Sequence, residues 1–597
     1  MSVQARDMND LEDQVLTAIV RSFGATLFDL NSFLGLKVES LFAQSELKLG
    51  LLGLCKKSRV IGMRRIAGER VYCVPYEHYI EHMTQLLSDL LNNLTPVDHI
   101  DEDCQSEGQD LVMDMVIMLA WVSRVQPQFN KKGQLDKKLV ETMLKHVQLV
   151  PDRLAPYIGM DAAKLPYPLP LSILIDFGLR LGIVQITDGQ LQVHQQRVTG
   201  WLELNPIELK LQLYHLWFKV HYPEQHLIRQ FLVLLPMLRS NDWFSIHHLL
   251  DQGEEMNLNQ IEEYLIAIQE LGWVQLGRTI DGSQAVLSLL GIEEHVQNRY
   301  PNEGWFVQPD FEIIVTPKVN YSDHYQFNTY ATLISRNQMY TYQITKESMF
   351  TAFQRGWTSD RVINHLMSFA RYGVPENIQI SIMEWSKLYR GVQLETVVIL
   401  RCETSAIAEQ LTRIPEVAHI LNEKSRLQPE LFLITDEDVD FIREKMNTYG
   451  YRTDNKRADP RINTHASNEL ESIQGIFHSR LRYDMYTQDE QHPEITSLYP
   501  GLADIPSGWM NSYVSYHMST RKQLLQQAIE WQCYVQVAHE GEDMIIAPVL
   551  ITLEDSTPVM EGIMYGKKIR LSLSKLEAMR LIAPGIHDIT KYMSTIV

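Results

Sequence analysis

The sequence predicts a multidomain α/β protein, in which three helical units that each end in a β-hairpin precede a mixed α/β domain and a small β-rich C-terminal domain. The chain has 597 residues, and a single hydrophobic core stops growing at roughly 250 to 300 residues, so about four domains are expected. Hydrophobic residues make up 45% of the chain and charged residues 21%, which is typical of folded domains. A turn signature that occurs twice marks the ends of two helical units. A later change to alternating helix and strand patterns marks the start of the mixed α/β domain.

Residues 1–96 predict the first helical unit. The segment LEDQVLTAIV opens it with apolar residues at helical spacing, and short helical segments follow. The segments VIGMRR and RVYCVP flank a turn at Ala67-Gly68 and predict a two-stranded hairpin. Three helices followed by a hairpin are the layout of a winged-helix domain.

Residues 97–110 predict a solvated linker, because they offer little that could build a core. Six acidic side chains lie in this segment: Asp98, Asp101, Glu102, Asp103, Glu107 and Asp110.

Residues 111–204 and 205–300 predict two more winged-helix-like units, because both close on the same signals. The first ends in LRLGIVQITDGQLQVH and the second in QELGWVQLGRTIDGSQAVLSL. In both, a helix ends at Leu-Gly, an apolar residue, Val and Gln open a strand, and Asp-Gly forms the next turn. Glycine suits the left-handed cap of a helix, and Asp-Gly suits a tight hairpin, so we expect helix-to-hairpin transitions at Gly182 and Gly272. The hairpins carry one basic residue, Arg278, which favours protein contacts or spacing as their role.

Residues 301–453 change to a mixed α/β pattern. The segment FEIIV predicts a strand, and the Thr and Ser residues at 345–348 and 358–361 are natural N-caps of two helices. A βαβα unit completes this domain. Residues 454–512 lack sustained periodicity and predict a linker, whereas residues 513–597 predict one helix followed by short alternating strands.

The composition excludes several classes of protein. The net charge of −20 argues against a protein that coats nucleic acid over its whole surface, so any such contact is local. The opening segment MSVQARDMNDLEDQ lacks the layout of a secretory signal, and no apolar stretch is long enough to span a bilayer. Five cysteines without a CxxC pair predict reduced, structural thiols. We therefore expect a cytoplasmic protein, with nucleoid association as an alternative, that binds no membrane.

No catalytic motif is recognisable in the sequence. A helicase motor needs a glycine-rich loop with Lys and Ser or Thr for the nucleotide phosphates, and no GxxxxGK[ST] (Walker A) segment occurs. The adjacent His247 and His248 diverge by roughly 100° on a helix, so they cannot share a metal without ligands from elsewhere. The sequence predicts a protein that is not an enzyme and that needs no cofactor or metal.

Basic residues of the first unit are the candidates for DNA contact. Between positions 45 and 72 they outnumber acidic residues seven to two: Lys48, Lys56, Lys57, Arg59, Arg64, Arg65 and Arg70. They fall on the third predicted helix and the hairpin, the parts of a winged helix that approach the duplex, and so predict salt-sensitive phosphate contact. The alternative is a basic face that docks on the protein's own acidic linker or on an acidic partner. A smaller cluster, Arg452, Lys456, Arg457 and Arg461, predicts either a solvated linker or a phosphate-binding arm.

The mixed α/β domain resembles the N-terminal domain of the XPB family of DNA helicases, which also occurs in bacterial helicase-associated proteins. The shared blocks are VQPD (307–310), TYQITKESMFTAFQRGWTSDRVINHL (341–366), YGVPENIQISIMEW (372–385) and YRGVQL (389–394), in the family's order. The order of domains resembles the XPB-anchoring subunit of transcription factor IIH. The C-terminal stretch is similar to a WYL domain, although VMEGIMYG stands in place of the tripeptide that names that family.

The resemblance implies a domain that binds an XPB-like helicase. Gln308 and Asp310 belong to the shared motif, and Trp357, Trp385 and Tyr389 are candidate partner anchors because aromatic residues dominate interface energetics. In the alternative interpretation Pro309 fixes the backbone, Asp310 caps a local turn and the aromatic side chains belong to the core.

Together these features predict a non-catalytic, DNA-associated scaffold or accessory protein. It would bind a helicase or other DNA-processing partner through residues 301–453, while its winged helices contact DNA or protein. One alternative is a ligand-responsive winged-helix transcription regulator, and another is a helicase fragment whose motor is a separate chain.

Overall fold

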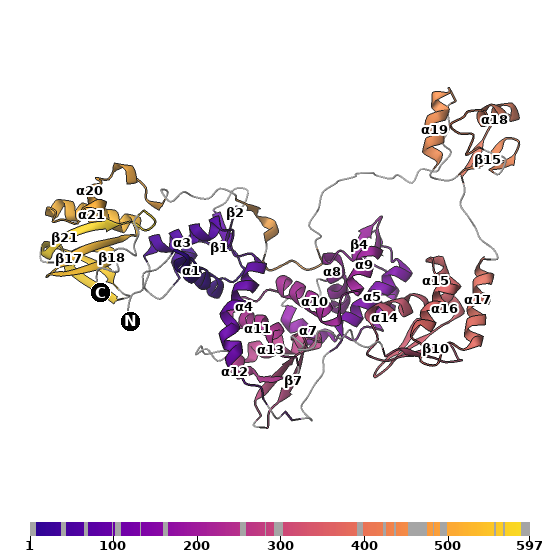
Figure 1. The fold of residues 1–597 in the computed structure, drawn as a ribbon, viewed down its shortest axis with the longest axis horizontal. Coiled ribbons are helices and arrows are strands. Elements are labelled where there is room, and N and C mark those ends of the chain that lie inside the picture. The colour runs from indigo at the N-terminus through magenta and orange to yellow at the C-terminus, as the bar shows by residue number, and fades with distance from the viewer. Residues whose placement is uncertain are drawn as a thin grey trace. The chain divides into compact units, whose positions relative to one another are not determined.

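The chain is mixed α/β, with many helices and several small antiparallel sheets, as the sequence predicts (Figure 1). The computed structural model describes residues 8–36, 43–64, 70–97, 100–101, 109–131, 133–158, 165–240, 242–250, 258–280, 282–291, 303–390, 398–421, 425–434, 438–451, 475–481, 483–489, 498–554, 557–564 and 567–586. The chain divides into two compact units. The first comprises Met1–Pro301, Val319–Gln326 and Ile473–Val597, and the second Asn302–Lys318 and Phe327–Ser472.

The first module of unit one spans residues 8–93. Its elements are α1 (Met8–Ser22), β1 (Phe28–Asp29), α2 (Leu30–Leu34), α3 (Gln44–Lys56), β2 (Ile61–Arg64), β3 (Arg70–Cys73) and α4 (Tyr76–Asn93). The predicted hairpin is present, and β3 lies between β1 and β2. Helix α3 packs closely on α1, because a Cβ added at Gly50 would meet the side chain of Val15.

Two further modules also place helices before a β-hairpin. The second has α5 (Leu111–Val125), α6 (Lys137–Leu144), α7 (Pro151–Ile158), α8 (Leu169–Arg180), β4 (Val184–Thr187), β5 (Gln190–Val193) and α9 (Gln195–Leu202). The third has α10 (Pro206–Val220), α11 (His226–Leu234), β6 (Trp243–Ser245), α12 (Ile246–Leu250), α13 (Leu258–Glu270), β7 (Val274–Arg278) and β8 (Gln284–Ser288). The strand order β6-β8-β7 repeats the order β1-β3-β2 of the first module.

The turn chemistry predicted for these modules is confirmed where the structure describes it, whereas Asp281 of the second Asp-Gly turn lies outside the described residues. Gly182 and Gly272 follow α8 and α13 with φ of 64° and 75°, the left-handed conformation that a glycine cap provides. Asp188 and Gly189 both have positive φ, 51° and 71°, as a tight hairpin between β4 and β5 requires.

Residues 475–481 and 483–489, which we call the strap, return to the first module. Within the strap, β16 (Thr487–Gln488) pairs antiparallel with β2 and adds a fourth strand to the sheet. The sequence predicts this stretch as part of a linker, and the structure differs here. The exposed edge of β2 offers unpaired backbone groups to any strand of suitable register, and a two-residue strand is too short to show periodicity in sequence.

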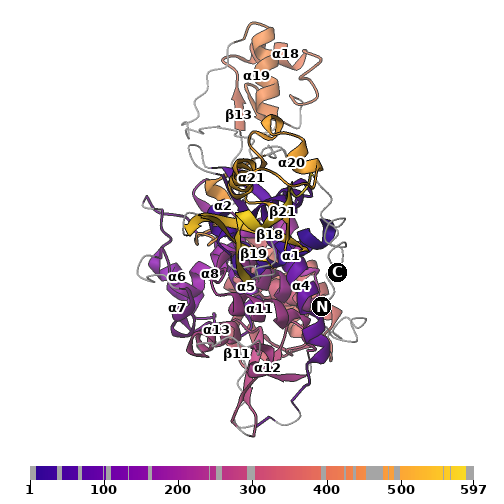
Figure 2. The same cartoon turned by 90° about the vertical axis from the view of Figure 1, so that its left-hand side faces the viewer.

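The C-terminal part forms one five-stranded sheet with a helix on one face (Figures 1 and 2). Its elements are α20 (Gly508–Asn511), α21 (Met518–Trp531), β17 (Tyr534–His539), β18 (Glu542–Glu554), β19 (Thr557–Met564), β20 (Lys567–Ser572) and β21 (Leu576–Ile582), with strand order β20-β19-β18-β17-β21. The predicted helix and strands are present. Tyr499 is 1% exposed and belongs to the core of this sheet, so the packed region begins before residue 513.

Unit two contains a four-stranded sheet covered by helices. The elements are β9 (Trp305–Val307), β10 (Glu312–Val315), β11 (Thr332–Arg336), β12 (Tyr340–Gln343), α15 (Lys346–Gln354), α16 (Ser359–Ser368) and α17 (Glu376–Arg390), and the strand order is β11-β12-β10-β9. Helix α14 (Tyr321–Tyr330) begins in unit one and ends in unit two. The predicted caps are confirmed, because Thr345 accepts a hydrogen bond from Ser348 N and Thr358 accepts one from Arg361 N.

The remainder of unit two has its own small core and sheet. It comprises β13 (Val398–Arg401), α18 (Ser405–Thr412), β14 (Arg426–Gln428), β15 (Leu431–Ile434) and α19 (Asp438–Thr448), with strand order β13-β15-β14. The predicted βαβα unit is therefore βαββα. Strand β14 has three residues and an irregular register with β15, too little for a recognisable alternation.

Two features of the described residues concern membrane insertion and thiol chemistry. None of the helices described is long and apolar enough to cross a bilayer. Cys55, Cys73, Cys402 and Cys533 are free and buried, and burial raises the pKa of the Cys55 thiol to about 11, which makes this thiol a poor nucleophile.

Candidate interaction surfaces

Six of the seven basic residues predicted to contact DNA lie in the described part of the chain, and Arg65 lies outside it. Lys56 is exposed at the end of α3. Lys57 Nζ lies 2.6 Å from Glu12 Oε2, and Arg59 forms a 3.2 Å ion pair with Glu81. These two pairs are internal to the first module. The other three residues contact more distant parts of the chain.

Arg64 and Arg70 share one carboxylate of the strap. Asp489 Oδ2 lies 3.0 Å from Arg64 Nε and 3.4 Å from Arg70 Nε, and the Asp489 side chain is only 9% exposed. The backbone holds this carboxylate in place, because Asp489 N donates to Gly62 O at 2.8 Å. Strap residues therefore occupy the hairpin edge and neutralise part of its positive charge.

Helix α3 packs against the C-terminal sheet. Nine of its thirteen residues are buried. Lys48 Nζ donates to Gln532 Oε1 at 2.7 Å, and Ser45 N donates to Gln532 O at 3.2 Å. The Tyr534 hydroxyl accepts from Ala43 N at 2.7 Å and donates to Glu46. The hydrogen bond to Gln532 places Lys48 in a contact within the chain, and partial burial lowers the pKa of this lysine.

The helices that precede the hairpins of the other modules also make contacts within the chain. Eleven of the twelve residues of α8 are buried. In α8, Asp176 accepts from Phe477 N of the strap at 2.9 Å and from Arg180 Nε at 2.8 Å. Burial raises the pKa of Asp176 although Arg180 opposes this shift. At the end of α13, Glu270 accepts from Val150 N of the second module at 2.7 Å.

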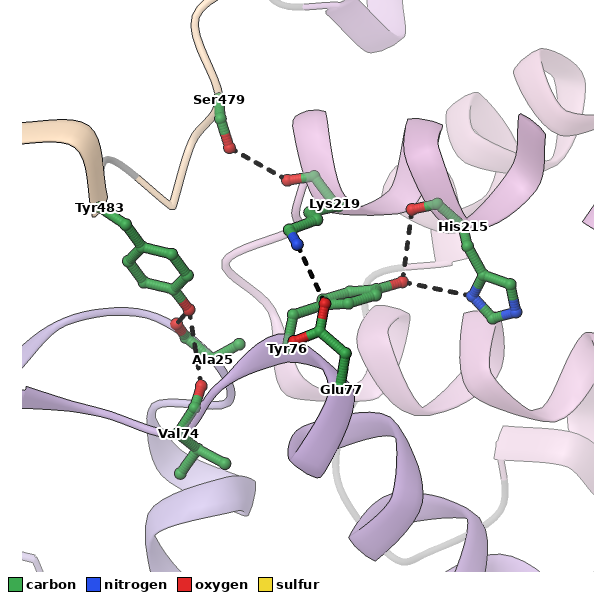
Figure 3. Close-up of polar contacts among 8 residues, drawn as sticks. All are labelled: Ala25, Val74, Tyr76, Glu77, His215, Lys219, Ser479 and Tyr483. Atoms are coloured by element: carbon green, nitrogen blue, oxygen red, sulfur yellow. Dashed lines mark hydrogen bonds and ion pairs between the residues drawn. The ribbon is translucent and has the colours of Figure 1, made fainter. Parts of the chain in front are cut away.

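The strap also joins the first and third modules (Figure 3). The Tyr483 hydroxyl donates to Ala25 O, and Ser479 Oγ donates to Lys219 O at 3.2 Å. Beside these contacts, Lys219 Nζ forms a 3.0 Å ion pair with Glu77, which ties α10 to α4. One segment thus contacts all three modules.

A buried arginine strengthens the junction between these modules. Arg229 is 2% exposed, and its guanidinium donates to Glu224 O at 2.6 Å and to Arg21 O at 3.1 Å. Tyr222 completes the contact, because its hydroxyl accepts from Ala25 N at 2.8 Å. Charged donors that bond to backbone carbonyls remain costly to disrupt when buried.

In unit two the motif residues Gln308 and Asp310 form a tight turn. Asp310 Oδ1 accepts from Glu312 N at 3.2 Å, and Phe311 N donates to Gln308 O at 3.1 Å, so the expected cap is present. Trp385 stacks on Phe311 with ring centroids 5.4 Å apart. The fold therefore brings Trp385 to this turn.

The other two aromatic candidates pack elsewhere in unit two. Trp357 lies between Arg361, whose guanidinium is 4.1 Å from the ring centroid, and Tyr330 at 5.1 Å. Tyr389 contacts Phe353 with ring centroids 5.6 Å apart. All three aromatic candidates are half-buried.

An exposed aromatic surface, which sequence reasoning did not identify, lies beside β9. We call Phe306, Phe369, Arg371 and Tyr372 the aromatic platform. Tyr372 is 89% and Phe369 48% exposed, while the Phe306 ring lies 5.7 Å from Tyr372 and 5.4 Å from the Arg371 guanidinium. The one signal in the sequence is the short run of aromatic and basic residues before Gly373.

The backbone beneath the aromatic platform is fixed. Trp305 N donates to Phe369 O at 3.2 Å, and Arg371 N donates to Trp305 O at 2.9 Å. Trp305 itself is buried, and its indole nitrogen donates to Leu366 O at 2.9 Å. The backbone that carries the exposed rings is therefore ordered before a partner binds, which removes one part of the entropic cost of binding.

A known protein family matches the part of the chain that contains the aromatic platform. A family model described as a helicase conserved C-terminal domain matches residues 305–426, so this part of the chain is similar to helicase sequences. No similar curated protein was found for this chain. The second basic cluster, Arg452 to Arg461, lies outside the described residues.

Proposed function

We propose that this chain is a non-catalytic helicase-associated scaffold, which binds a helicase or another DNA-processing partner through its domain at residues 301–453. The match of residues 305–426 to a helicase family model carries the proposal. An XPB-like fold for this domain agrees with the four sequence blocks of that family, and the sequence contains no Walker A loop of its own.

The three N-terminal modules act in this proposal as winged-helix domains that contact protein. In each module helices precede a hairpin, and the first and third modules share one strand order, which supports the winged-helix assignment. In a DNA-reading winged helix the helix that precedes the hairpin enters the major groove. Here α3 and α8 are largely buried, and α13 contacts the second module, which favours a structural role and weakens the case for an operator-reading regulator.

We assign partner binding in this domain to the aromatic platform. Tyr and Arg are enriched among the interface residues that dominate binding energy, and a nearly fully exposed Tyr372 next to Phe306 matches that composition. Trp357, Trp385 and Tyr389 are half-buried against other side chains, so we expect them to support the domain.

The proposal can be tested by capture of an XPB-like helicase with the full-length chain. Tyr372→Ala and Phe369→Ala should each weaken binding by about tenfold or more, because loss of a central anchor costs about 2 kcal/mol. Ile334→Ala is the matched control, since Ile334 is 58% exposed on β11 and lies outside the platform. Isothermal titration calorimetry gives the affinities.

Two results would count against the proposal. Equal affinity of all three variants for the helicase would remove the platform from the interface. Failure of the folded native chain to bind any XPB-like helicase, together with protection of a few genomic sites in footprinting, would favour the transcription regulator.

A further inference from the structure

The C-terminal part of unit one contains a cleft that has no role in the proposed function. Its volume is about 460 Å³, and it lies between residues 500–509 and α21. Pro500, Ile505, Pro506 and Trp509 provide an apolar lining, and Asp504 and Glu530 provide two carboxylates. Clefts of roughly 300 to 1,000 Å³ with a few polar groups on apolar walls are typical ligand sites.

The walls of this cleft are held by buried contacts. Trp531 Nε1 donates to Pro500 O at 2.9 Å, and the Trp531 ring packs on Tyr499 with centroids 5.3 Å apart. The Tyr499 hydroxyl donates to Pro584 O at 2.6 Å, which fixes the same wall to the end of the sheet. At the far side, the Tyr516 hydroxyl donates to Gly508 O at 2.9 Å. The cleft therefore exists before any ligand arrives, which lowers the cost of binding.

Three other carboxylates of this domain are neutralised by ion pairs. Glu540, Glu554 and Glu561 each form an ion pair with a lysine or arginine. Among the residues that the structure describes, neither Asp504 nor Glu530 forms an ion pair, and Glu530 accepts only a 3.4 Å hydrogen bond from Gln527. Two uncompensated negative charges thus stand beside an indole ring, whose face is also electronegative.

We infer that this cleft binds a lysine or arginine side chain of a partner protein. The aliphatic stem of either residue would lie on Pro500, Ile505 and Pro506, as such stems do on apolar surfaces. The cationic head would reach Asp504 and Glu530 and lie against Trp509, combining charge-assisted hydrogen bonds with a cation–π contact. The volume exceeds one side chain, so residues that flank the cation also fit.

The inference is tested with the full-length chain and a fluorescently labelled peptide that carries a single arginine between alanine and proline residues. The same peptide with citrulline is the neutral isostere. We expect the arginine peptide to bind at least about tenfold more tightly, with an affinity that falls as salt rises from about 50 to 300 mM. Fluorescence anisotropy measures both effects.

Variants of the cleft locate the binding. Asp504→Asn with Glu530→Gln should remove the preference for arginine over citrulline, and Trp509→Leu should weaken binding of the arginine peptide about tenfold. Glu542→Gln is the matched control, because it removes an exposed carboxylate of β18 outside the cleft. Circular dichroism shows whether each variant is folded.

Three outcomes would overturn the inference. The first is equal affinity for the arginine and citrulline peptides, and the second is an unchanged preference in the folded double variant. The third is full competition by free spermidine at the concentration of the peptide, which would identify a small-amine site. Because Tyr372 belongs to unit two, loss of helicase binding in Tyr372→Ala leaves these measurements unaffected.

Discussion

Asp489 shows how one acidic side chain reduces the positive charge that a basic cluster offers to DNA. Arg64 and Arg70 fall where a winged helix contacts phosphates, yet both lie within 3.4 Å of the Asp489 carboxylate. Asp489 is distant from both arginines in sequence, and its side chain is nearly buried. The charge that remains available for DNA at the hairpin is therefore smaller than the sequence indicates.

Asp489→Asn should increase the affinity of the chain for duplex DNA. Removal of the shared carboxylate frees two arginines, so the slope of log affinity against log salt should steepen by up to about 2. Fluorescence polarisation with a labelled duplex at several salt concentrations measures the slope. Asp440→Asn, which removes an exposed carboxylate of α19, is the control. An unchanged slope would mean that these arginines do not contact phosphates even when the carboxylate is removed.

His221 should make the junction between α10 and the strap sensitive to acid. Burial, with Arg480 and Arg180 nearby, lowers its pKa from 6.5 to about 3, and its ring packs on Phe477. Between these pH values the unfolded state binds a proton that the folded state excludes. Stability should therefore fall as pH decreases from about 6.5 to about 3, by up to about 1.4 kcal/mol per pH unit.

Urea unfolding at several pH values tests this effect. His221→Gln should reduce the slope of stability against pH in that window, even if it lowers stability at neutral pH. The same slope in the native chain and the variant would assign the acid sensitivity to other groups.

At the scale of elements, the strap connects modules that are separate in sequence. Its strand β16 pairs with β2. The backbone N–H of Phe477 donates to Asp176 of α8, and the Ser479 hydroxyl donates to a carbonyl at the end of α10. Gly475 lies very close to α8, because a Cβ there would meet the Asp176 carboxylate and the Arg180 guanidinium. A larger residue at this position must displace the strap or break that pair.

Gly475→Ala should destabilise the strap by about 1 to 3 kcal/mol, the usual cost of added atoms in a packed site. Hydrogen exchange should show faster exchange at residues 475–489. Gly200→Ala in α9 is the matched control, because its Cβ would meet nothing within 4 Å and alanine favours a helix by about 0.5 to 1 kcal/mol. Unaltered protection of the strap in Gly475→Ala would contradict this packing argument.

For the whole molecule, the scaffold proposal predicts that this chain does not turn over nucleotide. The purified protein should hydrolyse no ATP, because its sequence contains no Walker A segment. A coupled ATPase assay, with and without an XPB-like helicase, measures this. Turnover by the chain alone, abolished by a point substitution within it, would show that the scaffold proposal is wrong.

The sequence by itself determined the local structure of this protein. Glycines at helix ends, Asp-Gly turns, Thr caps and apolar periodicity act over a few residues, so Gly182, Gly272, Thr345 and strand β10 lie where the pattern predicts them. Only the tertiary structure decided which surfaces remain free. The contacts of Asp489 with Arg64, of Lys48 with Gln532 and of Phe306 with Tyr372 join distant positions. Such contacts depend on packing between elements, which leaves no periodic trace in the residues themselves.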